Sequence, residues 1–166
     1  MTSKLNERRR WLDQTNHITE YEREEMTAAI KRLIPSKFRG DIAPNYFVDP
    51  KSGEIWSNKR GDFKKLKWKV SGNSPYPAVV FRINDESFTV RVHRIVAETM
   101  HNFPIPPGVS EKEWKRTPAS VKRLFDQFWE VNHKDHDRSN FKPKNLEWVS
   151  RKENVQKYHQ HVAKRG

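Results

Sequence analysis

The chain of 166 residues contains no cysteine. This absence excludes a disulfide framework and any zinc site built on thiolates. The chain also has no apolar run near the roughly 18 residues that a membrane-spanning helix needs. Its first residues lead into charge and not into an apolar signal core. We therefore expect no membrane partner and a cytoplasmic location.

Acidic residues are few beside the basic ones, with 21 Asp and Glu against 33 Lys and Arg. The net charge of +12 and the sequence pI of about 10.0 predict a polyanionic partner, for which nucleic acid is the usual candidate. An anionic membrane surface is disfavoured because the cations do not collect on one face of an amphipathic helix. The alternative to a polyanionic partner is that the basic charge serves only the solubility of the protein. Its length predicts one compact domain with attached arms.

Residues 1–40 are predicted to form a helical basic arm. Residues 3–13 mix four cations with Trp and Leu, and a clearer helix runs from about Glu20 to Leu33. Thr19 and Glu22 have the spacing of a capping box at its start. The apolar stripe of this helix, which we assign to core packing, consists of Met26, Ala29, Ile30, Leu33 and Ile34.

Residues 41–100 are predicted to form a β-rich DNA-binding module that ends in a helix near residues 93–100. Short β-prone runs separated by turn residues predict a small antiparallel sheet of hairpins. The predicted strands are Tyr46–Val48, Glu54–Trp56, Leu66–Val70, Ala78–Ile83 and Phe88–Val92. In the third of them, apolar Leu66, Trp68 and Val70 alternate with Lys65, Lys67 and Lys69. A sheet with a basic outer face suits a DNA groove, although a solvated position is the simpler role for any single lysine.

Residues 101–130 are predicted to be a helical insertion. Ser110 and Glu113 form a second capping box, and Thr117 with Pro118 begins a further helix. The stripe of that helix consists of Val121, Leu124, Phe125 and Phe128. The insertion can pack on the core, bind DNA or contact a partner.

Residues 131–166 carry the most informative pattern, a histidine and three asparagines at set intervals. Asn132 and His133 end a predicted strand, Asn145 precedes the return strand, and Asn154 lies in the helix that follows. Such a helix can fold back across the hairpin and bring Asn154 near Asn132. Histidine can remove a proton from water, and asparagine offers a hard oxygen donor to ions such as Mg²⁺. In a protein of this charge the combination indicates hydrolysis of a phosphodiester.

This segment resembles the HNH nuclease superfamily with its ββα-metal fold, and it looks most like the phage and intron-associated HNH homing endonucleases. The residues that carry the resemblance are His93–Ala97, Val131–Asp135, Asn145–Val149 and Glu153–Asn154, with a weaker match at Tyr46–Val48 and Gly53–Ser57. The resemblance implies an α+β protein in which a small antiparallel sheet module precedes the ββα-metal motif, with a helical arm at the N-terminus.

The resemblance also implies a role for each motif residue. His133 is the general base, Asn132 and Asn154 hold one divalent cation, and Asn145 braces the hairpin by hydrogen bonds to the backbone of the hairpin. The cation is Mg²⁺, with Mn²⁺ as the alternative, and the partner is double-stranded DNA. Residues expected to bind DNA are Arg94, Lys134 and Arg138, together with Lys65, Lys67 and Lys69. His93 is expected to support the motif without taking part in catalysis.

Two positions depart from the superfamily pattern. Asn132 stands where Asp or His is common, so we expect weak metal binding until DNA supplies phosphate oxygens. His136 and Asp137 stand where Gly-Asn is common. Either the loop is less tightly turned, or His136 reaches the substrate.

The sequence thus predicts a metal-dependent DNA endonuclease of the phage homing or accessory type, acting in the host cytoplasm if a phage encodes it. The alternatives are a nucleic-acid-binding protein that keeps the fold without cleavage, and a nuclease accessory to phage DNA packaging. One active site makes nicking the simpler expectation, whereas a homodimer would cut both strands. Monomer and homodimer both remain open.

Overall fold

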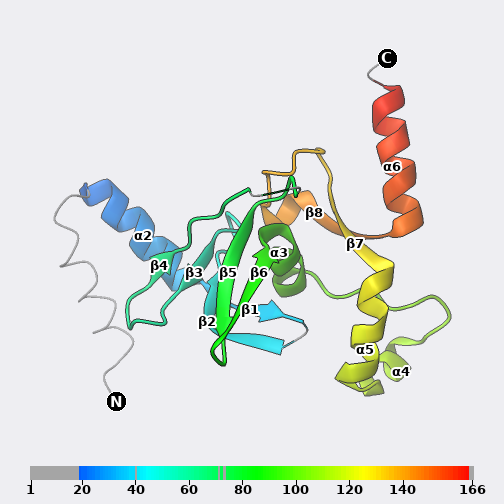
Figure 1. Cartoon of the computed structure of the whole chain (residues 1–166), viewed down its shortest axis with the longest axis horizontal. Coiled ribbons are helices and arrows are strands. Elements are labelled where there is room, and N and C mark those ends of the chain that lie inside the picture. Colours follow the sequence, from blue (N-terminus) through cyan, green and yellow to red (C-terminus); the bar gives the residue numbers. More distant parts are fainter. Residues whose placement is uncertain (1–18, 40, 71, 73, 165–166) are drawn as a thin grey trace.

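The computed structural model describes residues 19–164 except 40, 71 and 73. The predicted helical stretch at residues 3–13 lies outside this part. Figure 1 shows helix α2 (Glu20–Arg32) at one end of the molecule, helix α6 (Arg151–Ala163) at the other, and the strands between them. The mixture of helices with small antiparallel sheets confirms the predicted α+β class. Among the described helices, none is long and apolar enough to cross a membrane.

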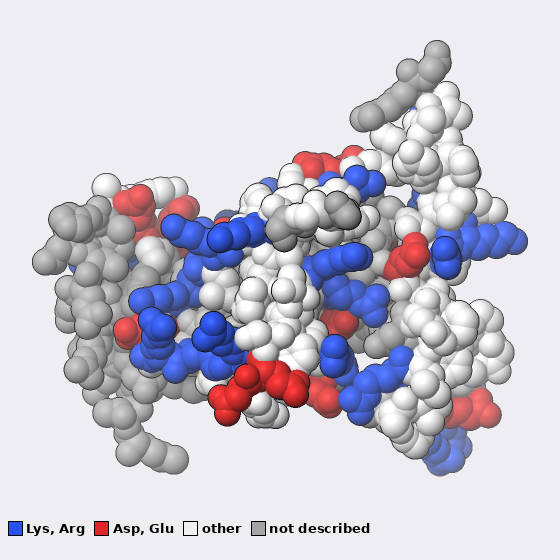
Figure 2. All heavy atoms as spheres, in the orientation of Figure 1, with Lys and Arg blue, Asp and Glu red and all other residues white. Residues whose placement is uncertain are grey.

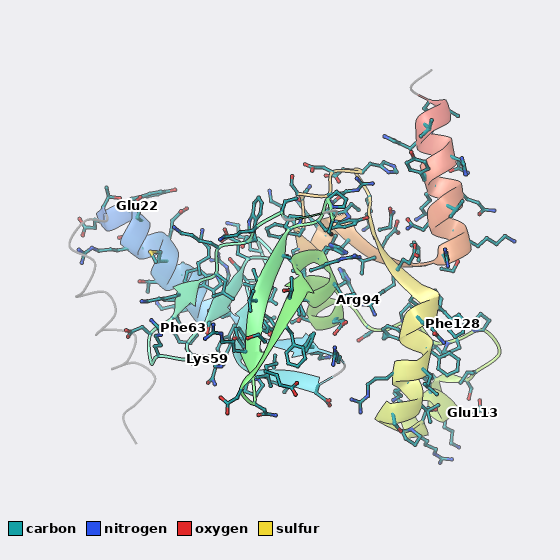
Figure 3. All side chains as sticks on the ribbon, in the orientation of Figure 1. Glu22, Lys59, Phe63, Arg94, Glu113 and Phe128 are labelled. Carbon is teal, nitrogen blue, oxygen red and sulfur yellow. The ribbon has the colours of Figure 1, made fainter. Side chains whose placement is uncertain are left out.

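Helix α2 begins at the predicted capping box, where Thr19 and Glu22 bond reciprocally. Its apolar stripe packs on the sheet as expected, because Ala29 and Ile30 are buried against Trp56. Phe47 and Phe63 close the same cluster, with ring centroids 5.2 Å apart, and Figure 3 shows Phe63 between the helix and the sheet.

Four strands form the first antiparallel sheet, in the order β1-β2-β3-β4. They are β1 (Ile34–Phe38), β2 (Asp41–Val48), β3 (Ile55–Ser57) and β4 (Lys64–Lys65). The sequence did not predict β1, and Ile34, which was assigned to the helical stripe, is its first residue. Because β1 lies at the sheet edge, Pro35 is tolerated in it despite lacking an amide hydrogen.

The predicted strand Leu66–Val70 is wrong. Strand β4 ends at Lys65, and among the described residues beyond it the pairing is reduced to a bond from the amide of Leu66 to the carbonyl of Ile55 and an isolated bridge between Lys69 and Ala78. Leu66 is partly buried against the core, but Trp68 is 45% exposed and Val70 55% exposed, so the segment has no continuous buried apolar face. Alternation alone suggested a strand, but the chain leaves the sheet before these residues can pair along their length.

The second sheet is the hairpin of β5 (Ala78–Ile83) and β6 (Glu86–Arg91), which leads directly into helix α3 (Val92–Met100) as predicted. Tyr46 of β2 stacks on Phe81 of β5 with ring centroids 4.0 Å apart, and its hydroxyl accepts a hydrogen bond of 2.7 Å from the amide of Arg82. This contact joins the first sheet to the second.

The capping box of Ser110 and Glu113 and the helices that follow were predicted correctly as elements. The helices are α4 (Glu111–Arg116) and α5 (Ala119–Phe125), followed by the 3-10 turn η1 (Asp126–Phe128). Trp114 is buried and meets Phe125 edge to face at 5.6 Å. By contrast, Leu124 and Phe128 of the predicted stripe are 65% and 57% exposed, so this stripe does not pack into the core.

The third sheet is the hairpin of β7 (Trp129–His133) and β8 (Leu146–Ser150), with the 3-10 turn η2 (Pro143–Asn145) before β8 and α6 after it. This strand–loop–strand–helix order is the predicted ββα unit. Val131, Phe141 and Leu146 of the unit share one buried core with β2, β3, β5, β6 and α3. The hairpin is therefore held against the rest of the molecule by apolar burial.

Candidate active site

The hairpin places the motif residues through its register. Asn132 lies opposite Glu147, and His133 lies opposite Leu146. Helix α6 begins directly after β8 with Ser150 as N-cap, so Asn154 falls in its first turns and returns towards β7. The geometry expected from the spacing is therefore present.

Asn132, His133 and Asn154 line one cleft of about 430 Å³, which we call the hairpin cleft. Its other lining residues are Tyr76, Val131, His136, Arg138, Val155, Tyr158 and His161. The cleft thus combines three histidines, two asparagines and an arginine, drawn from β7, the loop after it and α6.

Each of the two asparagines has its side-chain nitrogen bonded to a glutamate. Nδ2 of Asn132 donates to Oε1 of Glu147 at 2.8 Å, and Nδ2 of Asn154 donates to Oε2 of Glu130 at 2.6 Å. Both amides are thereby oriented with their nitrogens engaged, which leaves the carbonyl oxygens as the atoms that can face a cation. Two oxygen donors beside one cleft fit the requirement of Mg²⁺ or Mn²⁺ for hard ligands.

His133 is 5% exposed and sits at the end of β7. Burial lowers the pKa of its imidazole below the ordinary value, although the carboxylates of Asp135 and Asp137 act in the opposite direction. The neutral ring is therefore favoured at neutral pH. A neutral imidazole can accept a proton, which is what a general base must do.

His93 of α3 lies against His133, with ring centroids 5.0 Å apart. Tyr76 contacts both rings, at 4.5 Å from His93 and 6.0 Å from His133. Burial is the main cause that lowers the pKa of His93 to about 3, so this ring is neutral as well. The rings of Tyr76, His93 and His133 thus pack against one another at the end of β7.

Asn145 ties the loop between β7 and β8 together. Its Nδ2 donates to Oδ1 of Asp135 at 2.9 Å and to the carbonyl of Asn140 at 2.7 Å, and its Oδ1 accepts from the amide of Asp135 at 3.2 Å. Its backbone carbonyl also accepts from the amide of Lys134 at 2.9 Å. These hydrogen bonds connect Asn145 to both parts of the loop, as expected of a residue that braces the hairpin.

His136 keeps the tight turn at the position where glycine was the expected residue. Its φ is 63°, in the left-handed region, and its amide donates to the carbonyl of His133 at 2.9 Å. Its ring lines the hairpin cleft and stacks on His161 of α6, with centroids 3.7 Å apart. Of the two alternatives, the structure therefore favours a side chain directed to the cleft over a loosened loop.

The six basic residues predicted to bind DNA differ in their surroundings. Arg138 lines the hairpin cleft and lies over the ring of Tyr76, at 5.4 Å from its centroid. Arg94 instead bonds to Glu98 and to the carbonyl of Trp129, and its guanidinium covers Trp148 at 4.8 Å. Figure 3 shows Arg94 on the side of α3 that faces β7. Arg94 thus joins α3 to the hairpin.

The four lysines of the set are all exposed. Lys65 pairs with Glu54 at 2.9 Å, and Lys134 donates to the carbonyl of Lys144 at 3.0 Å. Lys67 and Lys69 lie in the segment after β4. Figure 2 shows Lys and Arg side chains gathered over the region of β3 and β4 and again beside α3.

Sequence reasoning missed three residues at this site: Tyr76, Glu130 and Glu147. His93, which was expected to support the motif, lies directly beside His133. Glu130 had a readable signal, because it stands two residues before Asn132 on the same strand face. Glu147 required the hairpin register. Tyr76 comes from a loop far upstream and had no local signal.

Comparison with known proteins gives three findings. Residues 90–156 match the family model described as HNH endonuclease. The H-N-H endonuclease F-TflI of Escherichia phage T5 is 31% identical over 115 residues, which are 69% of this chain and 47% of that relative. The chain thus spans about half the length of this curated relative. A solved structure of the HNH homing endonuclease I-HmuI aligns with 72% of this chain and 54% of its own at 26% identity, with a TM-score of 0.49.

Proposed function

We propose that this chain, whose residues 90–156 belong to the HNH endonuclease family as the sequence motif predicted, is a divalent-metal-dependent endonuclease that hydrolyses phosphodiester bonds in double-stranded DNA. The observation that carries the proposal is the hairpin cleft, which gathers Asn132, His133 and Asn154 from two elements. The phage homing or accessory role, and a location in the host cytoplasm, are part of the same proposal.

His133 acts in this proposal as the general base. Its buried ring is held neutral and stands at the cleft, so it accepts the proton of the water that attacks the scissile phosphate. Packing against His93 and Tyr76 fixes the plane of the ring. A fixed base lowers the entropic cost of reaching the transition state.

Asn132 and Asn154 would hold one cation, Mg²⁺ or Mn²⁺, through their carbonyl oxygens. When bound, such an ion stabilises the negative charge that develops on the phosphate and on the leaving 3′ oxygen. Because the ligands themselves are neutral, we expect the ion to bind weakly before DNA adds its phosphate oxygens. Among the described residues, Arg138 is the Lys or Arg that lines this cleft, and it would contact the backbone of the substrate.

The test is incubation of the full chain with supercoiled plasmid and Mg²⁺ or Mn²⁺. Nicked or linear product should form, and chelation with EDTA should abolish it. His133→Ala should lower the rate by about 10²–10⁴-fold, because a general base contributes that much. His159→Ala is the matched control, since His159 is an exposed histidine on α6 outside the cleft lining and its loss should leave the rate unchanged.

The second candidate is a nucleic-acid-binding protein that keeps the fold without cleavage, and the neutral ligand pair is the observation that favours it. A gel shift with the same DNA separates the two. DNA binding by the wild-type chain without any product in either metal would support the binding protein and reject the nuclease. If product forms, sequencing its ends reports strand choice and target preference.

A further inference from the structure

Both asparagines of the hairpin cleft are bonded through nitrogen to a carboxylate on another residue of the ββα unit. Glu147 reaches Asn132 across the β7–β8 ladder, where the two are register partners. Glu130 reaches Asn154 from β7 to α6. Two different pairs of elements therefore produce the same arrangement, an amide nitrogen facing a glutamate.

This arrangement decides which end of each amide faces the cation. An ionised carboxylate accepts hydrogen bonds but cannot donate them, so it can bond only to the nitrogen of the amide. The nitrogen of Asn132 is held at 2.8 Å and that of Asn154 at 2.6 Å, which keeps the oxygens on the opposite sides. Without the glutamates, either amide could rotate by half a turn and offer its NH₂ group, which repels a cation.

We propose that Glu130 and Glu147 are positioning residues for the cation, which fix the carbonyl oxygens of Asn132 and Asn154 towards it. The inference rests on the proposed function and deepens it. Neither glutamate lines the hairpin cleft, so neither contacts substrate in this role. They act through the asparagines, as carboxylates behind metal-binding histidines do in other metal sites.

The same glutamates supply charge that the ligands lack. Asn132 and Asn154 are neutral, whereas a carboxylate behind each one favours a cation in the space between them. Lys157 of α6 also bonds to Glu147, which keeps that carboxylate in place between the helix and the hairpin.

The first test measures metal affinity without cleavage. Mn²⁺ binding is followed by electron paramagnetic resonance in the full-length His133→Ala protein bound to its DNA, with and without Glu130→Ala or Glu147→Ala. Each glutamate change should weaken Mn²⁺ binding by about 10–100-fold. Glu54→Ala, which removes a surface carboxylate paired with Lys65, is the control and should leave the affinity unchanged.

Substitution by glutamine separates orientation from charge and covers the case in which an alanine variant fails to fold. In Glu147→Gln and Glu130→Gln the side-chain oxygen still accepts from the asparagine nitrogen, while the charge is lost. A weakening of Mn²⁺ binding that is smaller than for alanine supports the proposal. Unchanged Mn²⁺ affinity in the glutamine and alanine variants alike would overturn it.

Nicking kinetics in the protein that retains His133 add a readout that a merely structural role does not change. The Mg²⁺ concentration for half-maximal nicking should rise in Glu130→Ala and Glu147→Ala, and the rate at saturating Mg²⁺ should return towards that of the wild type. A lower maximal rate with an unchanged Mg²⁺ requirement contradicts the positioning role. If the wild-type chain binds Mn²⁺ but does not nick DNA, the proposed nuclease function is rejected. The comparison of Mn²⁺ affinities then still tests the positioning role of the glutamates.

Discussion

Gly53 lies in the turn between β2 and β3, where the loop of the hairpin cleft passes very close to it. Its φ is 76°, and a Cβ there would lie 2.3 Å from the carbonyl oxygen of Phe141. Phe141 is buried and belongs to the loop that Asn145 braces. Glycine at this position therefore allows the four-stranded sheet and the loop after His133 to pack in direct contact.

We expect Gly53→Ala to destabilise the protein more than Gly61→Ala does. Both glycines have positive φ, which costs a residue with a Cβ about 1–2 kcal/mol, but nothing lies within 4 Å of a Cβ at Gly61. The clash with Phe141 should add about 1–3 kcal/mol, as other overpacking changes do. Urea unfolding of the two variants measures the difference, and equal losses would show that the contact does not matter.

At the scale of elements, the start of α6 sets the position of Asn154. Ser150 is the N-cap, and its side chain bonds with Glu153 in a capping box that closes the first turn. The hydroxyl of Ser150 accepts from the amide of Glu153, and the carboxylate of Glu153 accepts from the amide of Ser150 at 2.8 Å. Since Asn154 follows Glu153 directly, this box fixes both the start of the helix and the direction in which the asparagine leaves it.

Ser150→Ala should therefore lower both stability and nicking rate. Loss of an N-cap costs about 0.5–2 kcal/mol, and a frayed first turn moves Asn154 away from Glu130. Ser110→Ala removes the equivalent cap from α4, far from the hairpin cleft in sequence and outside its lining. The control variant should lose similar stability in thermal unfolding while its nicking rate at saturating Mg²⁺ stays at the wild-type value. Equal loss of rate in both variants would contradict the argument.

At the scale of the whole molecule, basic charge is spread over more surface than the cleft occupies. Figure 2 shows cations over the first sheet as well as beside α3, and the net charge of the chain is +12. The DNA affinity that such cations supply depends on the salt concentration, because each phosphate that they neutralise releases condensed counterions. Contacts outside the cleft then supply affinity without taking part in the chemistry.

DNA affinity should fall linearly on a plot of log K against log salt concentration, with a slope of about −0.9 for each phosphate contacted. Arg138→Ala should reduce the magnitude of that slope by about one, because it removes one phosphate contact. Fluorescence anisotropy with a labelled duplex, between about 50 and 200 mM salt, measures both the affinity and the slope. Affinity that does not change with salt would reject a phosphate-based interface.

Local signals in the sequence determined most of the elements. Capping boxes placed the starts of α2 and α4, and the strand–loop–strand–helix order of the last segment was readable from its pattern. These features depend on neighbours three or four residues apart, which the sequence displays directly. The motif spacing also gave the residues that meet in the cleft, because Asn132, His133 and Asn154 belong to one short unit.

Only the tertiary structure decided what surrounds those residues. Strand β1 exists because β2 pairs with it, and the stretch Leu66–Val70 is not a strand because it lacks a partner along most of its length. Glu147 meets Asn132 through the register, and Tyr76 and His93 reach His133 from distant segments. Sequence spacing fixes local geometry, whereas contacts between separate segments depend on how the core folds them together. The asparagines proposed to bind the cation were therefore readable in advance, whereas the register that brings Glu147 to Asn132 was not.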